Sequence, residues 1–469
     1  MDASSSVPTS KKRKLGEGQN SGEHEDRINR LPDTMLTYII SFLPTKNAVG
    51  TSVLAKRWKN LWASVPVLDF DDTLILSKSS NKKRRVNKFM NFVDRVLHLH
   101  DLPNIQKFSL KCLDTRDASR IDSWITTALK HRVEEIFLNL KLDNACLLPS
   151  SFFICESLKT LKITGDFYED VDYIYKIPSC IRWSSLKFLN LDSLRLFSDR
   201  STHQVSLCCP ILEKLVLKFI EWWNIQSFSI SAPALQRCTM TYNDWGHGCA
   251  TEVHAENITY LKLRSTMVNE LSLHNLSSLA TAYIDICSSA EIGNRMSKVL
   301  QAVCNVKDLT FTDYAIAVIY RLDLLDHLHA FSSLMCLKVK ILHYQSRDDQ
   351  TGSNVRQLID LLYHLPNVEL LLLENGSSGC GFVEHEDGGA LDVIPQRNLT
   401  RLKSVKLEQF HGSANELYLV NFLLKNVVAL EKITIISSSK LSSDPKMQFE
   451  VAKNLLLHRG STHSEIEFS

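Results

Sequence analysis

The sequence of 469 residues lacks long apolar runs, paired cysteines and a large net charge. No run approaches the roughly 18 apolar residues that cross a membrane. The first 19 residues contain no apolar core, so we expect no secretory signal. The twelve cysteines include no CxxC pair, which indicates small buried residues in a reducing compartment. With a net charge of +2, nothing draws the whole chain to nucleic acid or membrane. We predict an intracellular soluble protein.

Motifs of catalytic sites are missing as well. The sequence has no GxSxG and no HExxH, and the loop Gly376–Gly381 lacks the GK[ST] ending of a phosphate-binding loop. His98 and His100 are two residues apart, as are His327 and His329, so on a helix the members of each pair face different directions. No cysteine or carboxylate cluster completes a metal site around them. We predict no catalytic residue, no metal and no cofactor.

The stretch Asp26–Asp72 holds more apolar surface than its size can bury. Apolar residues at i, i+3, i+4 and i+7 predict one helix with an apolar stripe: Leu36, Ile39, Ile40 and Leu43. Pro32 suits the first turn of this helix and Pro44 stops it. We expect Thr45 to cap a second short helix. A third helix is predicted to have this apolar side: Val53, Leu54, Trp58, Leu61 and Trp62.

Three helices in fewer than 50 residues fall below the size at which one core normally suffices. Part of this apolar surface is therefore predicted to bind another protein. The acidic run that follows, Asp69–Asp72, is expected to be a solvated turn rather than a metal site.

These residues resemble an F-box, of the group in plants that is followed by leucine-rich repeats and an FBD domain. The matching segments are Asp26–Ile28, Leu31–Asp33, Ile39–Lys46, Lys56–Trp58, Leu61–Trp62 and Leu68–Asp71. The departures are Asn29 and Ala55 at positions where serine is usual, and Gly50 on the second helix, which costs roughly 1 kcal/mol of helix propensity. The resemblance implies that residues 25–72 form an F-box that docks on a Skp-type adaptor and, through it, on a cullin.

Docking of this kind lays helices into a groove of the partner. The residues expected to contact the adaptor, or to pack beneath the contact, are Leu31, Pro32, Leu36, Ile39, Leu43, Pro44, Val53 and Trp58. Trp58 has a second interpretation, as an internal core residue.

The segments on either side of the predicted F-box are basic. Residues 1–24 are expected to be a disordered tail. Within the tail, Lys11, Lys12, Arg13 and Lys14 fit a nuclear-import signal, with a plain solvated tail as the alternative. We therefore expect a nuclear or cytoplasmic protein, the nucleus being favoured. Residues 73–104 are predicted to be an exposed linker (78–88) and an amphipathic capping helix. No aromatic interleaving accompanies the basic linker, so no nucleic-acid binding is predicted.

A pattern LxxLxL recurs thirteen times, mostly every 21–28 residues, which is the spacing of leucine-rich repeats. The pieces start at Ile105, Val133, Leu158, Leu186, Leu212, Leu235, Ile258, Leu279, Val306, Leu334, Val368, Leu402 and Leu430. The regular spacing predicts a solenoid over 105–395, in which each unit buries its apolar face against the next. Two longer intervals are expected to carry a loop with a helix near Leu358–Leu365 and a glycine-rich acidic loop (375–398).

Residues 396–469 resemble an FBD domain. A strand over 402–407 is followed by Ser413–Glu416, which reads as a capping box that opens a helix. We expect Asn426 to end that helix in a left-handed conformation, and a strand and a final helix to follow. The fold class is α/β: a three-helix F-box, a leucine-rich-repeat solenoid and a small α/β FBD domain.

The function implied by the resemblance is that of a substrate receptor in an SCF-type ubiquitin ligase, which is not itself an enzyme. The repeats would bind an unknown protein target with outward-facing strand residues such as Lys159, Lys187, Asn190, Lys214 and Lys262. The alternative is a scaffold or nuclear regulatory protein that uses the repeats without a ligase.

Overall fold

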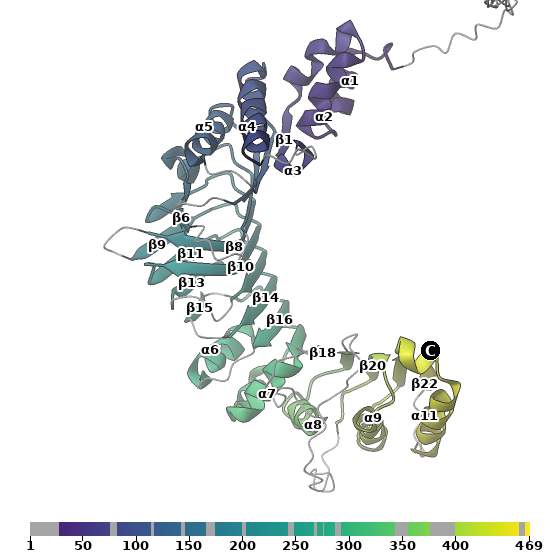
Figure 1. Ribbon diagram of the computed structural model, residues 1–469. Helices are drawn as coiled ribbons and strands as arrows, with labels where there is room; N and C mark the ends of the chain where they lie inside the picture. The colour runs from purple at the N-terminus through teal and green to yellow at the C-terminus, as the bar shows by residue number, and fades with distance from the viewer. Residues whose placement is uncertain are drawn as a thin grey trace, which may run out of the picture.

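The computed structural model forms a curved array of parallel strands with the N-terminal helices at one end (Figure 1). The main sheet lines the inner, concave side of the curve, and most helices lie on its outer side. The residues that the structure describes are 28–75, 82–113, 117–141, 146–165, 174–198, 203–242, 248–266, 270–274, 276–286, 292–342, 355–375, 399–458 and 465–469.

The N-terminal helical unit is built from short segments: α1 (Asp33–Ile40), α2 (Thr45–Gly50) and the 3₁₀ segments η1 (Thr51–Val53) and η2 (Lys56–Ser64). It has a small core of its own, formed by Leu36, Ile40, Ala48, Trp58, Leu61 and Val65. The prediction of a third helix that includes Val53 and Leu54 was wrong. The helical segment starts only at Lys56, and both earlier side chains are exposed.

Two other local predictions in this region were also wrong. Pro44, not Thr45, occupies the position before α2, and the buried Thr45 hydroxyl accepts a hydrogen bond from the Asp69 amide at 2.7 Å. The acidic run is not a solvated turn. Its first residues lie in strand β1 (Val67–Asp71), which pairs with the first repeat, and Asp72 begins the short helix α3 (Asp72–Ile75). Residues 67–71 therefore join the helical unit directly to the solenoid sheet.

Helix α4 (Lys82–Leu99) covers the first repeat, as predicted, through Phe89, Val93 and Val96. It is longer than expected, because the basic residues from Lys82 onward, interpreted as a loop, form its first turns. Helix α5 (Ala118–Lys130) follows, and Trp124 of α5 packs edge-to-face on Phe89. The basic stretch thus begins a capping helix.

Each of the thirteen LxxLxL pieces contains a strand of the main sheet, which confirms the predicted solenoid. The strands are β2 (Lys107–Cys112), β3 (Glu135–Leu140), β5 (Thr160–Thr164), β8 (Phe188–Phe197), β10 (Lys214–Trp223), β12 (Arg237–Thr241), β14 (Tyr260–Ser265), β16 (Thr281–Ile286), β17 (Asp308–Thr312), β18 (Cys336–Ile341), β19 (Leu370–Asn375), β20 (Ser404–Phe410) and β21 (Lys432–Ser437). Strand β22 (Glu465–Phe468) adds a further parallel strand after them, and the two-to-three-residue strands β4 (Cys146–Leu147) and β6 (Ile174–Lys176) extend the sheet beside β8.

The outer layer changes along the chain. In the middle it is a second parallel sheet: β7 (Cys180–Arg182), β9 (Gln204–Cys208), β11 (Ser227–Ser231), β13 (Ala250–His254) and β15 (Leu271–His274). On either side of it the layer is helical: η3 (Ser150–Ile154), α6 (Gly293–Val303), α7 (Asp313–Arg321), η4 (Leu325–Ala330), α8 (Val355–Tyr363), α9 (Ala414–Asn426), α10 (Ser439–Ser442) and α11 (Pro445–His458).

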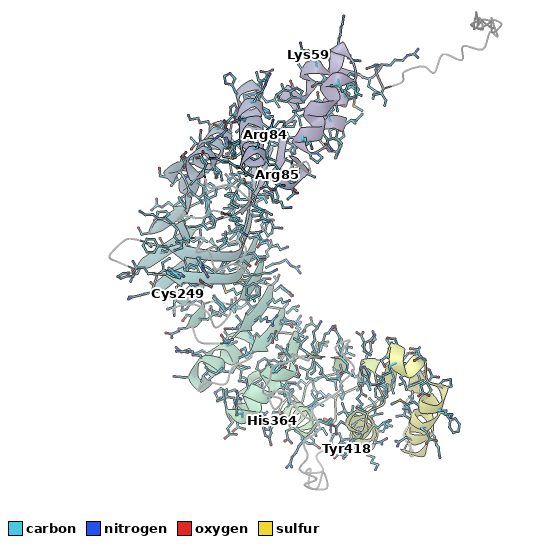
Figure 2. All side chains as sticks on the ribbon, in the orientation of Figure 1. Lys59, Arg84, Arg85, Cys249, His364 and Tyr418 are labelled. Atoms are coloured by element: carbon cyan, nitrogen blue, oxygen red, sulfur yellow. The ribbon has the colours of Figure 1, made fainter. Side chains whose placement is uncertain are left out.

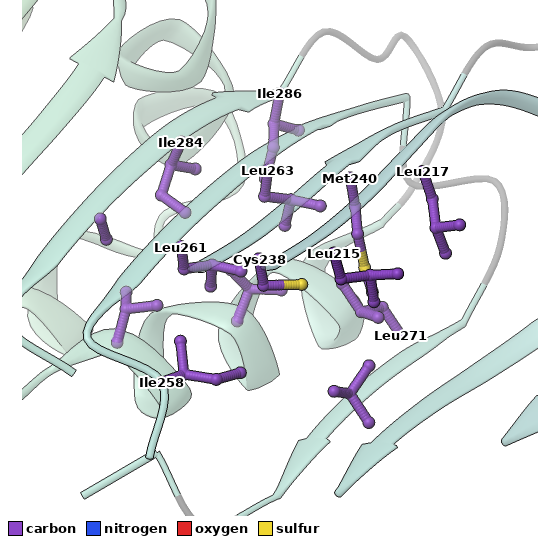
Figure 3. Close-up of a cluster of buried hydrophobic side chains, with 14 of the residues drawn as sticks. Leu215, Leu217, Cys238, Met240, Ile258, Leu261, Leu263, Leu271, Ile284 and Ile286 are labelled. Carbon is purple, nitrogen blue, oxygen red and sulfur yellow. The ribbon is translucent and has the colours of Figure 1, made fainter. Parts of the chain in front are cut away.

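The core lies between the two layers. In each strand alternate residues point inward, so that the two apolar residues of each "LxL" are buried while the residue between them faces the concave side. Figure 3 shows this stacking for β10, β12, β14 and β16, where Leu215, Cys238, Leu261 and Ile284 lie in a continuous apolar cluster. Each unit therefore buries its apolar face against its neighbours, as a solenoid requires.

The C-terminal segment continues the same sheet. The predicted capping box is confirmed, because the Ser413 hydroxyl accepts a bond from the Glu416 amide and the Glu416 carboxylate accepts one from the Ser413 amide. The prediction that Asn426 ends the helix in a left-handed conformation was wrong. Asn426 is the last helical residue, and its side-chain amide donates to the Phe422 carbonyl at 2.9 Å. Helix α8 is confirmed, and the loops around it (343–354 and 376–398) lie outside the described residues.

A buried carboxylate at the start of α7 gives a pH-dependent stability. Asp313 accepts a hydrogen bond from the Leu342 amide at 3.0 Å, and burial raises the pKa of its carboxyl to about 6. The folded state therefore holds a proton that the unfolded chain releases near pH 4, so this group lowers stability as the pH rises from about 4 to 6.

We expect Asp313→Asn to remove this loss of folding stability, which amounts to about 3 kcal/mol at most. Its amide oxygen still accepts the Leu342 bond. Denaturant unfolding at pH 4.5 and 7 measures the effect, since the difference between the native and variant proteins should grow with pH. An equal difference at both values would contradict the prediction.

Candidate functional site

The N-terminal helical unit exposes an unusual amount of apolar surface. Of the seventeen large apolar residues that are exposed in the described part of the chain, eight lie between residues 28 and 54. These eight define the N-terminal apolar face: Ile28, Met35, Tyr38, Ile39, Phe42, Leu43, Val53 and Leu54. On soluble proteins, exposed apolar side chains that gather in one region mark protein-interaction sites.

Helix α1 produces this face because both of its sides are apolar. Leu36 and Ile40 point into the small core, while Met35, Tyr38 and Ile39 lie on the exposed side. The Tyr38 and Phe42 rings pack edge-to-face with their centroids 4.9 Å apart, although their side chains remain more than 60% exposed. The aromatic pair therefore forms a preformed apolar ridge.

The structure divides the eight predicted adaptor residues into two groups. Leu36 and Trp58 are buried in the small core. Those at or near the surface are Leu31, Pro32, Ile39, Leu43, Pro44 and Val53. Five residues of the apolar face were not among the predicted adaptor residues: Ile28, Met35, Tyr38, Phe42 and Leu54. The spacing of 35, 38, 39 and 42 is itself helical and could have identified a second apolar side.

Polar contacts fix the entry to α1. The Trp58 indole Nε1 donates to the Asn29 side-chain oxygen at 2.7 Å, which satisfies the one polar atom of this buried ring. Arg57 donates to the Asp33 carboxylate at 2.8 Å and to the carbonyls of Leu31 and Asn29. Segment 29–33 is thereby held against η2, which fixes where α1 begins.

The second candidate surface is the concave face of the main sheet. The strands of the main sheet pair in parallel, which places outward residues in ladders across the sheet, with a register shift between β20 and β21. One ladder includes Asn190, Val216, Thr239 and Lys262. Among the residues predicted to face a target, Asn190, Lys214 and Lys262 lie on this face. Lys159 and Lys187 instead precede their strands and pair with Glu134 and Glu213.

Charges on the concave face are partly paired. Lys338 and Lys340 both contact the Glu374 carboxylate, at 2.5 and 2.8 Å. Burial acts to raise the pKa of Glu374, but the hydrogen bonds from the two lysines lower it below its usual value. Arg264 lies 3.4 Å from the buried carboxylate of Asp285, whose pKa is raised by burial. These ion pairs lie on the C-terminal half of the concave face.

Three potential metal ligands meet on the outer, helical side, where Figure 2 labels His364. Ligand atoms of Asp326, His329 and His364 all lie within 4.8 Å of one another. His364 Nδ1 donates to the Asp360 carbonyl at 2.8 Å, and its Nε2 lies 3.9 Å from the Asp326 carboxylate. In a tetrahedral zinc site the ligand atoms lie about 3.4 Å apart, and the Asp326 side chain is 92% exposed. We assign no metal to this open cluster.

Among the helices of the described residues, none is both long enough and apolar enough to span a membrane.

Comparison with known proteins agrees with this geometry. The family model described as "F-box domain" matches residues 28–70, and the model described as "At1g61320/AtMIF1, LRR domain" matches residues 96–458. Three relatives come from Arabidopsis thaliana. F-box/LRR-repeat protein At4g14103 is 34% identical over 61% of this chain and 77% of its own length. F-box/LRR-repeat protein 13 is 28% identical over 94% and 96%, and the putative F-box/FBD/LRR-repeat protein At3g59240 is 26% identical over 91% and 86%.

A helical unit with an exposed apolar face, joined to a parallel-strand solenoid, thus defines a protein-binding molecule. The chain belongs to the F-box/LRR-repeat proteins. This family is generally one of non-catalytic adaptors or receptors: the F-box domain generally binds Skp1-type adaptors, and the repeats bind targets.

Proposed function

We propose that this chain is the substrate receptor of an SCF-type ubiquitin ligase. The F-box would dock on a Skp-type adaptor, which connects it to a cullin, and the repeats would hold a target protein for ubiquitination and degradation. The observation that carries the proposal is the N-terminal apolar face, which stands on a small core of its own and is left uncovered by the rest of the described chain.

The adaptor contact would use the exposed side of α1 and the turn after α2. Ile39, Leu43 and Val53 would touch the adaptor directly, with Leu31, Pro32 and Pro44 at the edge. Leu36 and Trp58 would support them from below. A standard interface buries about 800 Å² per partner and is dominated by a few aromatic and aliphatic anchors. The apolar face offers such anchors in Tyr38 and Phe42.

The connection between the F-box and the repeats would set where a bound target lies relative to the adaptor. Strand β1 pairs with β2, and the Ala63 and Pro66 carbonyls accept bonds from the Asp101 and Gln106 amides at 3.1 and 2.8 Å. The F-box would therefore hold the concave face in a fixed orientation to the ligase. Ubiquitin transfer by the complex would then depend on proximity and orientation.

Two finer assignments are part of the same proposal. Residues 396–469 would be an FBD domain, supported by the name of the relative At3g59240, a putative F-box/FBD/LRR-repeat protein, and by the capping box of α9. The basic run Lys11–Lys14, which lies outside the described residues, would act in nuclear import. Imaging a fluorescent fusion with and without alanine at these four positions tests the import role; equal nuclear signal would contradict it.

The experiment that tests the receptor role is co-precipitation of the cullin with the tagged full chain. We expect the native chain to recover the cullin and Leu31→Ala plus Pro32→Ala to lose most of it, because both residues border the apolar face. Met335→Ala plus Val428→Ala is the control, since these apolar side chains are exposed elsewhere. Recovery by none of the three chains would contradict the proposal and favour a scaffold that acts without a ligase. Equal recovery by all three would contradict the docking role of Leu31 and Pro32.

A further inference from the structure

Three adjacent strands of the concave face carry positive charge where they pair; the one carboxylate on them, Glu221 of β10, lies beyond the paired length and contacts Arg195 at 2.7 Å. Over the paired length, β10, β12 and β14 present nine outward positions. These are Lys214, Val216, Lys218, Arg237, Thr239, Thr241, Tyr260, Lys262 and Arg264. Five of the nine are cations and none is acidic. On the strands that flank them, Asp192 and Asp285 occupy outward positions, so the absence of acid is confined to this region.

Aromatic rings hold three of the cations in place. Lys214 Nζ lies 5.0 Å from the centre of the Phe188 ring, the Arg237 guanidinium 4.8 Å from Tyr260, and Lys262 Nζ 4.6 Å from Tyr283. In the described part of the chain, no ion pair is formed by Lys214, Arg237 or Lys262. A cation–π contact orders the cation without neutralising its charge.

Each of the other two cations lies near one carboxylate of a flanking strand. Lys218 is 3.9 Å from Asp192, and Arg264 is 3.4 Å from Asp285. Burial lowers the pKa of Lys262, and the positive charges of Lys218 and Lys340 add to this effect. Like charges are therefore close enough to oppose one another here. We define the basic–aromatic patch as Phe188, Lys214, Lys218, Arg237, Lys262 and Tyr283.

We propose that the basic–aromatic patch binds a segment of the target protein that is rich in aspartate and glutamate; this inference rests on the proposed receptor function. The dimensions agree with an extended chain. Paired strands lie about 4.8 Å apart, and alternate residues of an extended peptide lie about 6.7 Å apart. Carboxylates at neighbouring and alternate positions can therefore reach several cations at once, while the rings contact the apolar parts of the segment.

A peptide fits the surroundings better than nucleic acid does. Asp192 lies on one side of the patch and Asp285 and Asp308 on the other, so the positive region is short. A phosphodiester chain that extended beyond the patch would meet these carboxylates, and the net charge of the whole chain is only +2. A short acidic segment can end before it reaches them.

The test uses the full chain and fluorescence anisotropy with two labelled 12-residue peptides: one of alternating Asp-Glu and apolar residues, and one with Asn and Gln in place of the acids. We expect the acidic peptide to bind and the amide peptide to bind at least roughly tenfold more weakly. Lys214→Glu, Arg237→Glu and Lys262→Glu together should abolish the preference. The matched control is Lys298→Glu, Lys446→Glu and Lys453→Glu, which changes net charge equally on the helices and should keep it.

Thermal unfolding of both triple variants excludes misfolding as the cause, and single charge reversals at Lys214 or Lys262 provide milder tests. Equal losses in both triple variants, equal binding of the two peptides, or tighter binding of a 12-nucleotide RNA would overturn the inference. Adaptor binding is measured on the same samples. If the native chain binds adaptor but not the acidic peptide, the patch assignment fails alone; if it binds the peptide but no adaptor, the receptor function fails.

Discussion

Replacing Phe42 and Val53 by aspartate is expected to weaken binding of a purified Skp-type adaptor at least ~100-fold. Both side chains are mostly exposed, 71% for Phe42 and 87% for Val53, so the folded chain alone should tolerate the change. In the complex each aspartate would place an unpaired charge in an apolar contact, which costs far more than the lost apolar area. Titration calorimetry measures the dissociation constant.

The control replaces a phenylalanine and a valine that are equally exposed but far from the apolar face. Phe449 of α11 is 67% exposed, and Val428, just after α9, is 72% exposed. Phe449→Asp plus Val428→Asp should leave adaptor affinity within about twofold. A similar loss in both double variants would mean that charge or aggregation, rather than a specific contact, controls the measurement.

Phe70→Ala should have the second large effect, because it removes the aromatic contact between the N-terminal unit and the solenoid. Phe70 lies in β1, is 1% exposed, and packs edge-to-face on Phe92 of α4 and Phe108 of β2, at 6.2 and 6.0 Å. Removing a buried phenylalanine ring costs about 3–5 kcal/mol. We expect a lower unfolding temperature and faster proteolysis between β1 and α4.

The effect of Phe70→Ala on function distinguishes binding of the adaptor from positioning of the target. The Phe70 ring does not belong to the N-terminal apolar face, so adaptor affinity should remain near the native value while ubiquitin transfer to a bound target decreases. Leu99→Ala is a suitable control, since Leu99 is exposed at the end of α4. Loss of adaptor binding in Phe70→Ala would show that the N-terminal unit depends on the solenoid for its own fold.

The repetitive part of the fold was predictable because its signal is periodic. Every LxxLxL piece supplies the same two buried residues to the same core, so register and burial follow from the pattern alone. The layer on the outer side did not follow from it. Strands β7, β9, β11, β13 and β15 are only three to five residues long, too short to give a clear period, and their pairing depends on neighbours about 20–26 residues away.

Predictions of helix caps and other local features were correct in some places and wrong in others. The capping box at Ser413 and Glu416 was correct because both partners are three residues apart. Thr45 was misinterpreted because its hydroxyl bonds to Asp69, a partner 24 residues away that no local rule identifies. The acidic run was misinterpreted for the same reason, since its strand conformation depends on pairing with β2.

The apolar face was only partly predictable. A helical stripe at Leu36, Ile39, Ile40 and Leu43 does not tell which of its members face the core; packing against Trp58 and Leu61 decides that. For the concave face, the sequence alone indicated only that lysines lie on predicted strands. Only the register revealed that five cations on three neighbouring strands lie together without an acid among them.

The most direct test of the central claim, that a partner covers the N-terminal apolar face, is peroxide oxidation of two methionines followed by mass spectrometry. Met35 lies on this face and Met335 lies beside β18, and they are 49% and 50% exposed. Adding a Skp-type adaptor should slow oxidation of Met35 several-fold and leave Met335 unchanged. If Met35 is oxidised at the same rate with saturating adaptor, the apolar face is not the docking site.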